Sequence, residues 1–359
     1  MGHRTPGRRR MKTLGKIQNN CQLNPLQELW LGGTYPESFY SHFDNKTEDL
    51  FCKITELTNK DLDNFEHVLN GIGINTVRPQ FDQPLEKYMD DQDNLIKPPI
   101  SPCDWSIVVD DTLYITPQYH HDTQPFGHAI DEYKAQGQKV EILDRSKDSM
   151  CWVIFPSLLR MGKDLYFDFD PLQHEQKKNT IKSANMFTST HRVHVSGTGG
   201  DHLDGVFCPL KDKQIFSSHY RSAYHKSFPG WNVFKLPEPK GNGHSEKWWL
   251  PGINYGHFNN EVIKVADDWL GNPQETVFGV NILVVDEKNV VCVAQDDNAR
   301  KHFDSLGITM HVADFKTCYF WDAGIHCLIS DVYRSGPPVD FWPDRGQNGY
   351  YNLEDEYNI

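Results

Sequence analysis

A short pattern that recurs along the chain constrains its fold more than any other feature. Four times, two apolar runs flank a polar turn made of Asp, Gly, Asn, Lys or Glu. Short polar turns between runs rich in β-branched and aromatic residues are typical of β-hairpins. We therefore expect hairpins within residues 105–115, 158–167, 205–216 and 280–293.

A second pattern follows most of these hairpins, a helix-like stretch and then a short strand. Residues 297–306 have the composition of a helix, Gly307 is suited to end it, and residues 308–312 have that of a strand. Five such units predict an α/β protein with one closed radial repeat rather than two separate domains. The other four units end in strands expected at residues 74–77, 139–142, 193–195 and 231–234.

The composition excludes several classes of protein. The 359 residues are 38% hydrophobic, enough for a packed core, and their formal net charge of −13 argues against binding to nucleic acid. No apolar run approaches the length of about 18 residues that a membrane span needs. The eight cysteines are scattered and none forms a CxxC pair. We therefore expect no metal site, and reduced thiols in a cytoplasmic protein.

Three segments fall outside the repeat. Residues 1–16 begin with a strongly basic stretch and are expected to be a disordered leader. Residues 17–345 are expected to form a single domain, interrupted by a loop insertion around 235–275 that is rich in Pro, Gly and Trp. A loop of this length is either functional or a surface decoration. Residues 346–359 are expected to be an acidic tail.

The residues that could carry chemistry are far apart in the sequence. Cys327 follows His326 in an apolar segment, and His202 and Asp204 belong to the segment DHLD at 201–204. A thiol nucleophile, an imidazole and carboxylates are the groups needed to attack a cationic carbon such as that of a guanidinium. Each residue alone also has a structural explanation, as a buried thiol, a surface imidazole or a capping carboxylate.

Four segments carry a family resemblance: PCDW at 102–105, DHLD at 201–204, VNILVVDEK at 280–288 and HC at 326–327. In this order and spacing they resemble the amidinotransferases of the pentein superfamily, the group that includes arginine:glycine amidinotransferase. The resemblance extends from Asn24 almost to Arg334. It implies a five-bladed α/β propeller, the pentein fold, built from pseudo-five-fold ββαβ repeats, in agreement with the five units counted above.

The resemblance also implies roles for five residues. Cys327 matches the nucleophile, and His202 matches the general acid and base. Asp104 and Asp204 match the carboxylates that hold the guanidinium nitrogens. Arg221 matches the residue that binds the carboxylate of the amino acid.

The implied reaction moves the amidino group of arginine to an acceptor amine through a covalent amidino-cysteine and releases ornithine. Glycine is the default acceptor, and guanidinoacetate is then the second product. The implied partners are small molecules, with no cofactor, no metal, no nucleic acid and no membrane, in a protein compatible with a homodimer. If water replaces the amine, the enzyme is an arginine deiminase or dihydrolase. A non-catalytic pentein that binds arginine or a protein partner is the third alternative.

Two positions depart from the family pattern. The family has an Asp that pairs with the catalytic His where this chain has Ile154. Three other carboxylates, Asp148, Asp168 and Asp201, are candidates to replace it. The family's transferases also carry paired Ser residues where this chain has Glu275-Thr276. An added carboxylate there favours a cationic or neutral amine over an anionic group as the second substrate.

Overall fold

The structure is a computed structural model. It describes residues 14–90, 95–116, 124–144, 146–153, 155–169, 174–196, 202–218, 224–237, 269 and 279–352. The insertion around 235–275 lies almost wholly outside these ranges, apart from residues 235–237 and Trp269.

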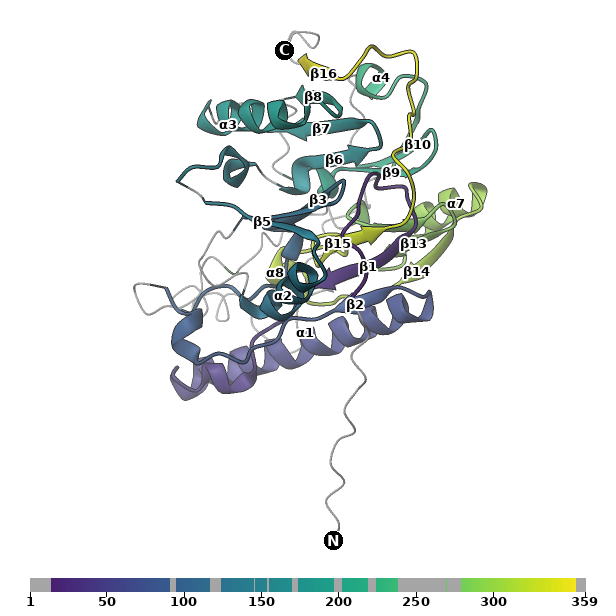
Figure 1. The fold of residues 1–359 in the computed structure, drawn as a ribbon. Coiled ribbons are helices and arrows are strands. Elements are labelled where there is room, and N and C mark those ends of the chain that lie inside the picture. Colours follow the sequence, from purple (N-terminus) through teal and green to yellow (C-terminus); the bar gives the residue numbers. More distant parts are fainter. Residues whose placement is uncertain are drawn as a thin grey trace.

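Five small sheets with one common strand order make up the fold (Figure 1). In each sheet the first two strands pair antiparallel, and the third pairs parallel with the second. In this order, the strands are β15 (Ile329–Arg334), β1 (Leu26–Leu31) and β2 (Asn75–Val77); β3 (Ser106–Val109), β4 (Thr112–Ile115) and β5 (Lys139–Ile142); β6 (Leu158–Met161), β7 (Asp164–Asp168) and β8 (Arg192–Ser196); β9 (Phe207–Lys211), β10 (Gln214–Ser217) and β11 (Asn232–Lys235); and β12 (Leu283–Asp286), β13 (Asn289–Cys292) and β14 (Thr309–Val312).

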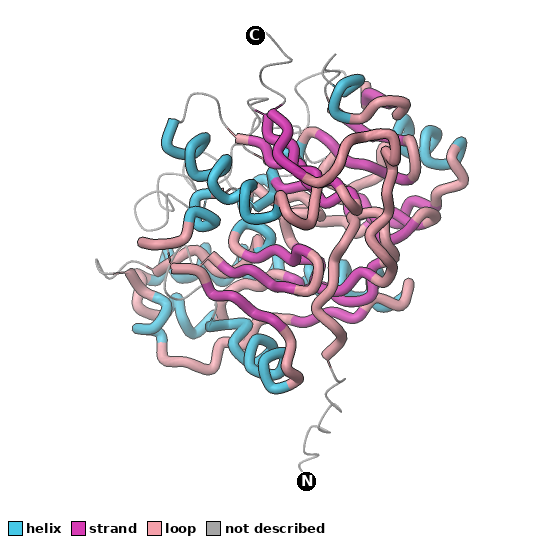
Figure 2. The backbone as a smooth tube through the Cα atoms, turned by 45° about the horizontal axis from the view of Figure 1, so that its top comes forward, coloured by secondary structure: helices cyan, strands magenta, loops and turns pink. Residues whose placement is uncertain are grey.

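A helix connects the second and third strands of each sheet, which makes each unit a ββαβ repeat. Figure 2 shows the strands gathered toward the middle of the molecule and the helices mostly toward its outside. The connecting helices are α1 (Asn45–Gly71), α2 (Gly127–Ala135), α3 (His174–Ala184), α4 (Tyr224–Ser227) and α7 (Asp297–Ser305). The other helices are α8 (Cys318–Trp321) and the 3₁₀ turns η1 (Glu37–Tyr40), η2 (Leu85–Tyr88), η3 (Pro102–Asp104), η4 (Gln124–Phe126), η5 (Ser149–Trp152), η6 (Phe155–Ser157), η7 (Asn185–Phe187) and η8 (Leu203–Gly205).

The first repeat is closed by the far end of the chain. β1 pairs antiparallel with β15, with Leu29 opposite Asp331 and Trp30 opposite Ser330. Because the remaining four repeats each begin with a local hairpin, this one long-range pair joins the N-terminal and C-terminal parts of the domain. β16 (Gly349–Asn352) adds a fourth strand to the third sheet by pairing parallel with β8.

The sequence of α1 explains both its start and its packing. The Asp44 carboxylate accepts the backbone N–H groups of Lys46 and Thr47 at 3.1 and 3.2 Å, which caps the first turn. Apolar residues at helical spacing then give the helix one buried face. Burial of each such side chain contributes about 1.5–3 kcal/mol to folding. The largest side chains on this face are Phe51, Leu62, Phe65 and Leu69.

The predicted repeats are confirmed. All four expected hairpins are antiparallel pairs, and each of the five expected helix-to-strand units is present. α7 ends where Gly307 adopts a φ of +70°, a conformation that glycine adopts without strain. No helix in the described part of the chain is both long and apolar enough to cross a membrane.

The two terminal segments contain contacts and a strand that the sequence analysis did not predict. Residues 14–16 were expected to end a disordered leader, yet the backbone N–H of Leu14 donates to Glu132 and that of Gly15 donates to Glu28 at 2.9 Å. Residues 1–13 lie outside the described ranges. Within the expected acidic tail, residues 349–352 form β16, and residues 353–359 lie outside the described ranges.

Candidate active site

The candidate residues lie in the short segments that precede the first strand of each repeat. Asp104 ends η3, just before β3, and His202 and Asp204 flank the start of η8, just before β9. Cys327 precedes β15, and Asn281 precedes β12. Because the repeats are arranged about one centre, segments at equivalent positions meet there although they are up to 223 residues apart in sequence, the separation of Asp104 and Cys327.

The sulfur of Cys327 is buried and held by an amide. Asn281 Nδ2 donates to Cys327 Sγ at 3.0 Å, and Asp204 Oδ2 lies 3.7 Å from the same sulfur. Asn281 Oδ1 accepts the backbone N–H groups of His326 and Cys327 at 2.8 and 3.2 Å. A Cβ on Gly324 would approach the Asn281 side chain to 2.4 Å, so the absence of a side chain at Gly324 leaves room for this amide.

Hydrogen bonds favour a thiolate at Cys327. A hydrogen bond from Cys103 lowers the pKa of the Cys327 thiol, burial and the carboxylates Asp204 and Asp104 oppose the shift, and a hydrogen bond from His202 adds to it. The result is a pKa below the ordinary thiol value. Loss of solvation lowers the pKa of His202, but its hydrogen bond to Cys327 and the charges of both carboxylates outweigh this and raise the pKa to about 10. The site therefore shifts Cys327 toward the thiolate and keeps His202 protonated.

The two oxygens of the buried Asp204 carboxylate have different surroundings. Oδ2 accepts from His326 Nδ1 at 2.8 Å and from Asn281 Nδ2 at 3.2 Å. Oδ1 is buried and accepts no hydrogen bond among the described residues. Burial opposes ionisation, but the bond to His326 and the charges of His326 and His202 keep the pKa of Asp204 below its usual value. Asp204 is thus an ionised carboxylate with one oxygen available for a donor.

Asp104 adds a second carboxylate near the sulfur. It is half-buried, and Cys103 Sγ lies 3.5 Å from its Oδ1. Burial raises the pKa of Asp104, and the charges of His202 and Lys97 counteract it. The arrangement therefore provides two carboxylates, an imidazole and a thiol within one small region, the set needed to bind and attack a planar cation.

A buried charge cluster lies next to this region. Asp331, four residues after Cys327, accepts from Arg160 Nη2 at 2.8 Å and Arg334 Nε at 2.6 Å. Arg160 also donates to the Val108 carbonyl, and Arg334 donates to that of Val284, at 2.8 and 2.9 Å. The cluster thus joins the strands β15, β6, β3 and β12, four of the five repeats, at their centre.

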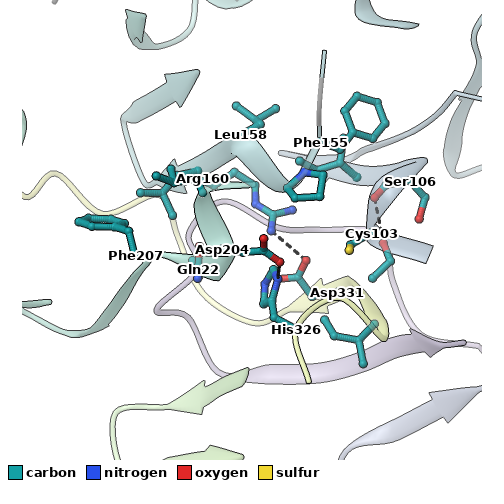
Figure 3. Close-up of a pocket in the computed structure, with 16 residues that line it drawn as sticks. Gln22, Cys103, Ser106, Phe155, Leu158, Arg160, Asp204, Phe207, His326 and Asp331 are labelled. Atoms are coloured by element: carbon teal, nitrogen blue, oxygen red, sulfur yellow. Dashed lines mark hydrogen bonds and ion pairs between the residues drawn. The ribbon is translucent and has the colours of Figure 1, made fainter. Parts of the chain in front are cut away.

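A pocket adjoins both the site and the charge cluster (Figure 3). Cys103, Asp204 and His326 line it together with Arg160 and Asp331. Among the described residues, the ligand atoms of Cys103, Asp204 and Cys327 all lie within 4.8 Å of one another. Two sulfurs and an oxygen in this arrangement could hold a soft cation such as zinc.

Comparison with solved structures assigns the fold. The amidinotransferase SxtG of the saxitoxin biosynthetic pathway from Microseira wollei superposes with a TM-score of 0.63 at 15% sequence identity, over 91% of this chain and 99% of that one. The inosamine-phosphate amidinotransferase StrB1 from Streptomyces griseus superposes with a TM-score of 0.64 at 15% identity, over 90% and 99%. The chain has the pentein fold. The five-bladed α/β architecture expected from the sequence is therefore confirmed.

Sequence comparison finds amidinotransferases as well. Mitochondrial glycine amidinotransferase from Danio rerio is 23% identical over 187 residues, which are 50% of this chain and 37% of that protein. L-arginine:L-lysine amidinotransferase from Pseudomonas savastanoi pv. phaseolicola is 21% identical over 181 residues, 49% of this chain and 43% of that protein. The chain thus matches less than half the length of these relatives. No protein-family model matches it.

The structure brings together four of the five residues singled out in the sequence: Cys327, His202, Asp104 and Asp204. Arg221 lies outside the described residues, as do Ile154, Asp201 and Glu275-Thr276. Asp148 and Asp168, candidates to replace the partner of the histidine, accept the backbone N–H groups of Asp144 at 2.8 Å and Phe169 at 3.0 Å.

Sequence reasoning gave no role to Cys103, Asn281 or His326, which contact the nucleophile or Asp204. All three belong to the segments that carry the resemblance. Cys103 adjoins Asp104, His326 adjoins Cys327, and Asn281 precedes a hairpin in the place that Asp104 occupies before β3. Their position at the start of a repeat is the signal that could have identified them.

Proposed function

We propose that this protein transfers the amidino group of arginine to an acceptor amine through a covalent intermediate on Cys327, and releases ornithine. The observation that carries the proposal is the Asp204 carboxylate, which is buried and ionised and lies 3.7 Å from the sulfur of Cys327. Its Oδ1 has no donor among the described residues. A buried carboxylate oxygen without a donor is costly unless a ligand supplies one.

A guanidinium fits this demand. It is planar and cationic, and a carboxylate binds its N–H groups in a charge-assisted fork. Asp204 offers one oxygen, and Asp104 offers a second carboxylate nearby. Held between them, the substrate would present its central carbon to Cys327. The positive charge of the substrate would further favour the thiolate.

The proposed chemistry has two halves. The Cys327 thiolate attacks the guanidinium carbon, and the bond from that carbon to the side-chain nitrogen of arginine breaks while His202 gives its proton to the leaving amine. Ornithine departs and the amidino group remains on sulfur. An acceptor amine then gives a proton to His202 and attacks the same carbon, and the thiolate leaves. The raised pKa of His202 keeps a proton available for the first half.

The acceptor is the least constrained part of the proposal. The two relatives named above are described as acting with glycine and with L-lysine, so the acceptor differs between similar proteins. Glycine is our default acceptor, with guanidinoacetate as the product, and Arg221 is proposed to bind a substrate carboxylate. Water in place of an amine would make the protein a hydrolase. We also propose a cytoplasmic location, because the eight cysteines are scattered and none forms a CxxC pair.

Isotope labelling tests the proposal. The wild type, Cys327→Ser and the control Cys52→Ser are incubated with arginine labelled at the guanidino carbon, with glycine, with lysine and with no amine. We expect the label on the peptide that holds Cys327 and repeated release of ornithine only when an amine is present. Neither should occur in Cys327→Ser. Cys52 lies on the distant helix α1, so its variant should behave like the wild type.

Each other outcome has a definite meaning. Labelled citrulline or urea without an amine product would replace the transferase with a hydrolase. Label on a different cysteine, or turnover by Cys327→Ser equal to that of the wild type, would overturn the assignment of the nucleophile. Arginine binding without any adduct or product would make the protein a binder.

A further inference from the structure

A second buried thiol lies beside the nucleophile. Cys103 Sγ donates to the Cys327 carbonyl oxygen at 3.2 Å. Their sulfurs lie within 4.8 Å of each other. All eight cysteines are free in this structure, so the pair is reduced.

The two thiols differ in their readiness to react. Cys327 Sγ accepts an amide N–H from Asn281 at 3.0 Å, an interaction that favours a thiolate. Cys103 Sγ instead donates its proton to a backbone carbonyl, an interaction that favours a thiol. Peroxides oxidise thiolates rather than thiols, and a second thiol within reach then traps the oxidised sulfur as a disulfide. Cys327 is therefore the sulfur that peroxide oxidises, and Cys103 is the thiol that then reacts with it.

We propose that Cys103 and Cys327 form a reversible oxidation site, in which peroxide oxidises Cys327 and Cys103 closes a disulfide with it. In the first step the Cys327 thiolate takes one oxygen from hydrogen peroxide, which gives a sulfenic acid and hydroxide. In the second step the Cys103 thiol attacks that sulfur, the S–O bond breaks, and water leaves. The peroxide is reduced and the two thiols are oxidised by two electrons in total.

The geometry allows the disulfide between Cys103 and Cys327 to form with only local movement. A disulfide needs its sulfurs about 2.05 Å apart, so the two sulfurs must approach from their present separation. Cys103 Sγ already touches the backbone of Cys327, which limits the movement to side-chain rotation and small shifts of the loop before β15. Because Cys103 adjoins Asp104 in η3, the same bond would remove the nucleophile and tie down the segment that carries one of the carboxylates.

The disulfide would also have a protective effect. A sulfenic acid that meets no thiol is oxidised further to sulfinic acid, which ordinary thiols do not reduce. With Cys103 in contact, the oxidised nucleophile can be recovered by a dithiol. A site that admits a guanidinium group, as proposed above, also admits the smaller peroxide molecule.

Peptide mapping of the full-length protein tests the proposal directly. Wild type, Cys103→Ser, Cys103→Ala and the control Cys52→Ser are treated with hydrogen peroxide, blocked with an alkylating agent and digested without reductant. We expect a linked pair of peptides holding Cys103 and Cys327 in the wild type and in Cys52→Ser. Both Cys103 variants should instead carry sulfinic acid on Cys327.

Recovery with dithiothreitol is the second readout. Oxidised wild type should regain on the order of ten times more free thiol at Cys327 than oxidised Cys103→Ser, because only the disulfide is reducible. Sulfinic acid on Cys327 in the wild type without any linked pair would overturn the proposal. So would equal recovery by the wild type and both Cys103 variants.

These readouts do not depend on turnover. The loss and recovery of transferase activity rests on the proposed function, but the peptide map and the thiol count do not. A linked pair in a protein that shows no transfer from arginine would leave the oxidation site standing and refute the function. Transfer from arginine without a linked pair of peptides would leave the proposed function standing and refute the oxidation site.

Discussion

Asn281 offers the sharpest test of how the nucleophile is held. Its amide nitrogen donates to Cys327 Sγ at 3.0 Å, and its oxygen accepts two backbone N–H groups of the loop that carries this cysteine. Two substitutions separate these functions. Asn281→Ala removes both, whereas Asn281→Asp keeps an acceptor for the backbone and replaces the donor with a negative charge.

The structure gives the magnitudes. In Asn281→Ala two buried backbone donors lose their acceptor, and at about 1–3 kcal/mol for each unsatisfied group the free energy of unfolding should fall by about 2–6 kcal/mol. In Asn281→Asp a carboxylate stands at the 3.0 Å position beside the thiolate. At an effective dielectric constant of about 20 the repulsion is about 5 kcal/mol, reduced where the new carboxylate takes up a proton beside Asp204. We expect the pKa of Cys327 to rise by about one to three units.

The rate of alkylation by iodoacetamide measures the pKa of the Cys327 thiol, whatever reaction the protein catalyses. The rate of modification of the peptide that holds Cys327 is followed against pH, and its midpoint reports the thiol pKa. Asn289→Asp is the matched control, because Asn289 is half-buried on β13 and bonds Asp286 rather than the site. An unchanged midpoint in Asn281→Asp, or a melting temperature of Asn281→Ala equal to that of the wild type, would refute this account.

Two further predictions concern His202 and Asp331. His202→Asn should raise the pH midpoint for alkylation of Cys327, since it removes the imidazolium. Folding raises the pKa of His202 from about 6.5 to about 10. The stabilisation of the fold by protonated His202 should therefore be complete below pH 6.5 and disappear as the pH rises through 10, which melting curves against pH can check. Asp331→Asn should cost about 3–5 kcal/mol in denaturant unfolding at pH 7, since it leaves two buried guanidinium groups short of a charge. Burial opposes ionisation of Asp331, but these guanidinium groups keep its pKa below its usual range, so the stabilisation should be lost only as the pH falls through that lowered pKa. The exposed Asp344→Asn is the control, and equal stability of both variants would contradict the prediction.

The repeat could be predicted from the sequence because its signals are local. Hairpin turns and helix ends depend on a few adjacent residues, and β5 has the bounds expected for it, residues 139–142. The pairing of β1 with β15 could not be predicted in this way. Its partners are some 300 residues apart, and no turn connects them. β16 was missed for the same reason, because its partner β8 is more than 150 residues upstream.

The candidate site was predictable only in part, for a different reason. A resemblance identifies residues whose type is recognised, such as Cys327 and Asp204. It says nothing of which atoms they contact. That Asp204 gives one oxygen to His326, while the other accepts no hydrogen bond within the described part of the chain, depends on the relative placement of two repeats. The role of Asn281 likewise depends on three contacts to one loop that is distant in sequence.

The position of these residues explains how one fold can hold such a site. The segment before the first strand of a repeat comes to the centre of the molecule, and four of the five segments supply Asp104, His202 with Asp204, Asn281 and Cys327. The fifth precedes β6 and contains position 154, where the family's partner acid is absent from the sequence. Beneath them the Asp331 cluster ties four repeats together through buried ion pairs and backbone carbonyls. Since that cluster consists of residues on the strands rather than in the segments before them, a residue in one segment can change while the others keep their places. Ile154 stands where the resemblance predicts an Asp that pairs with His202, and we expect this difference to affect His202 and to leave the thiolate and the carboxylates in position.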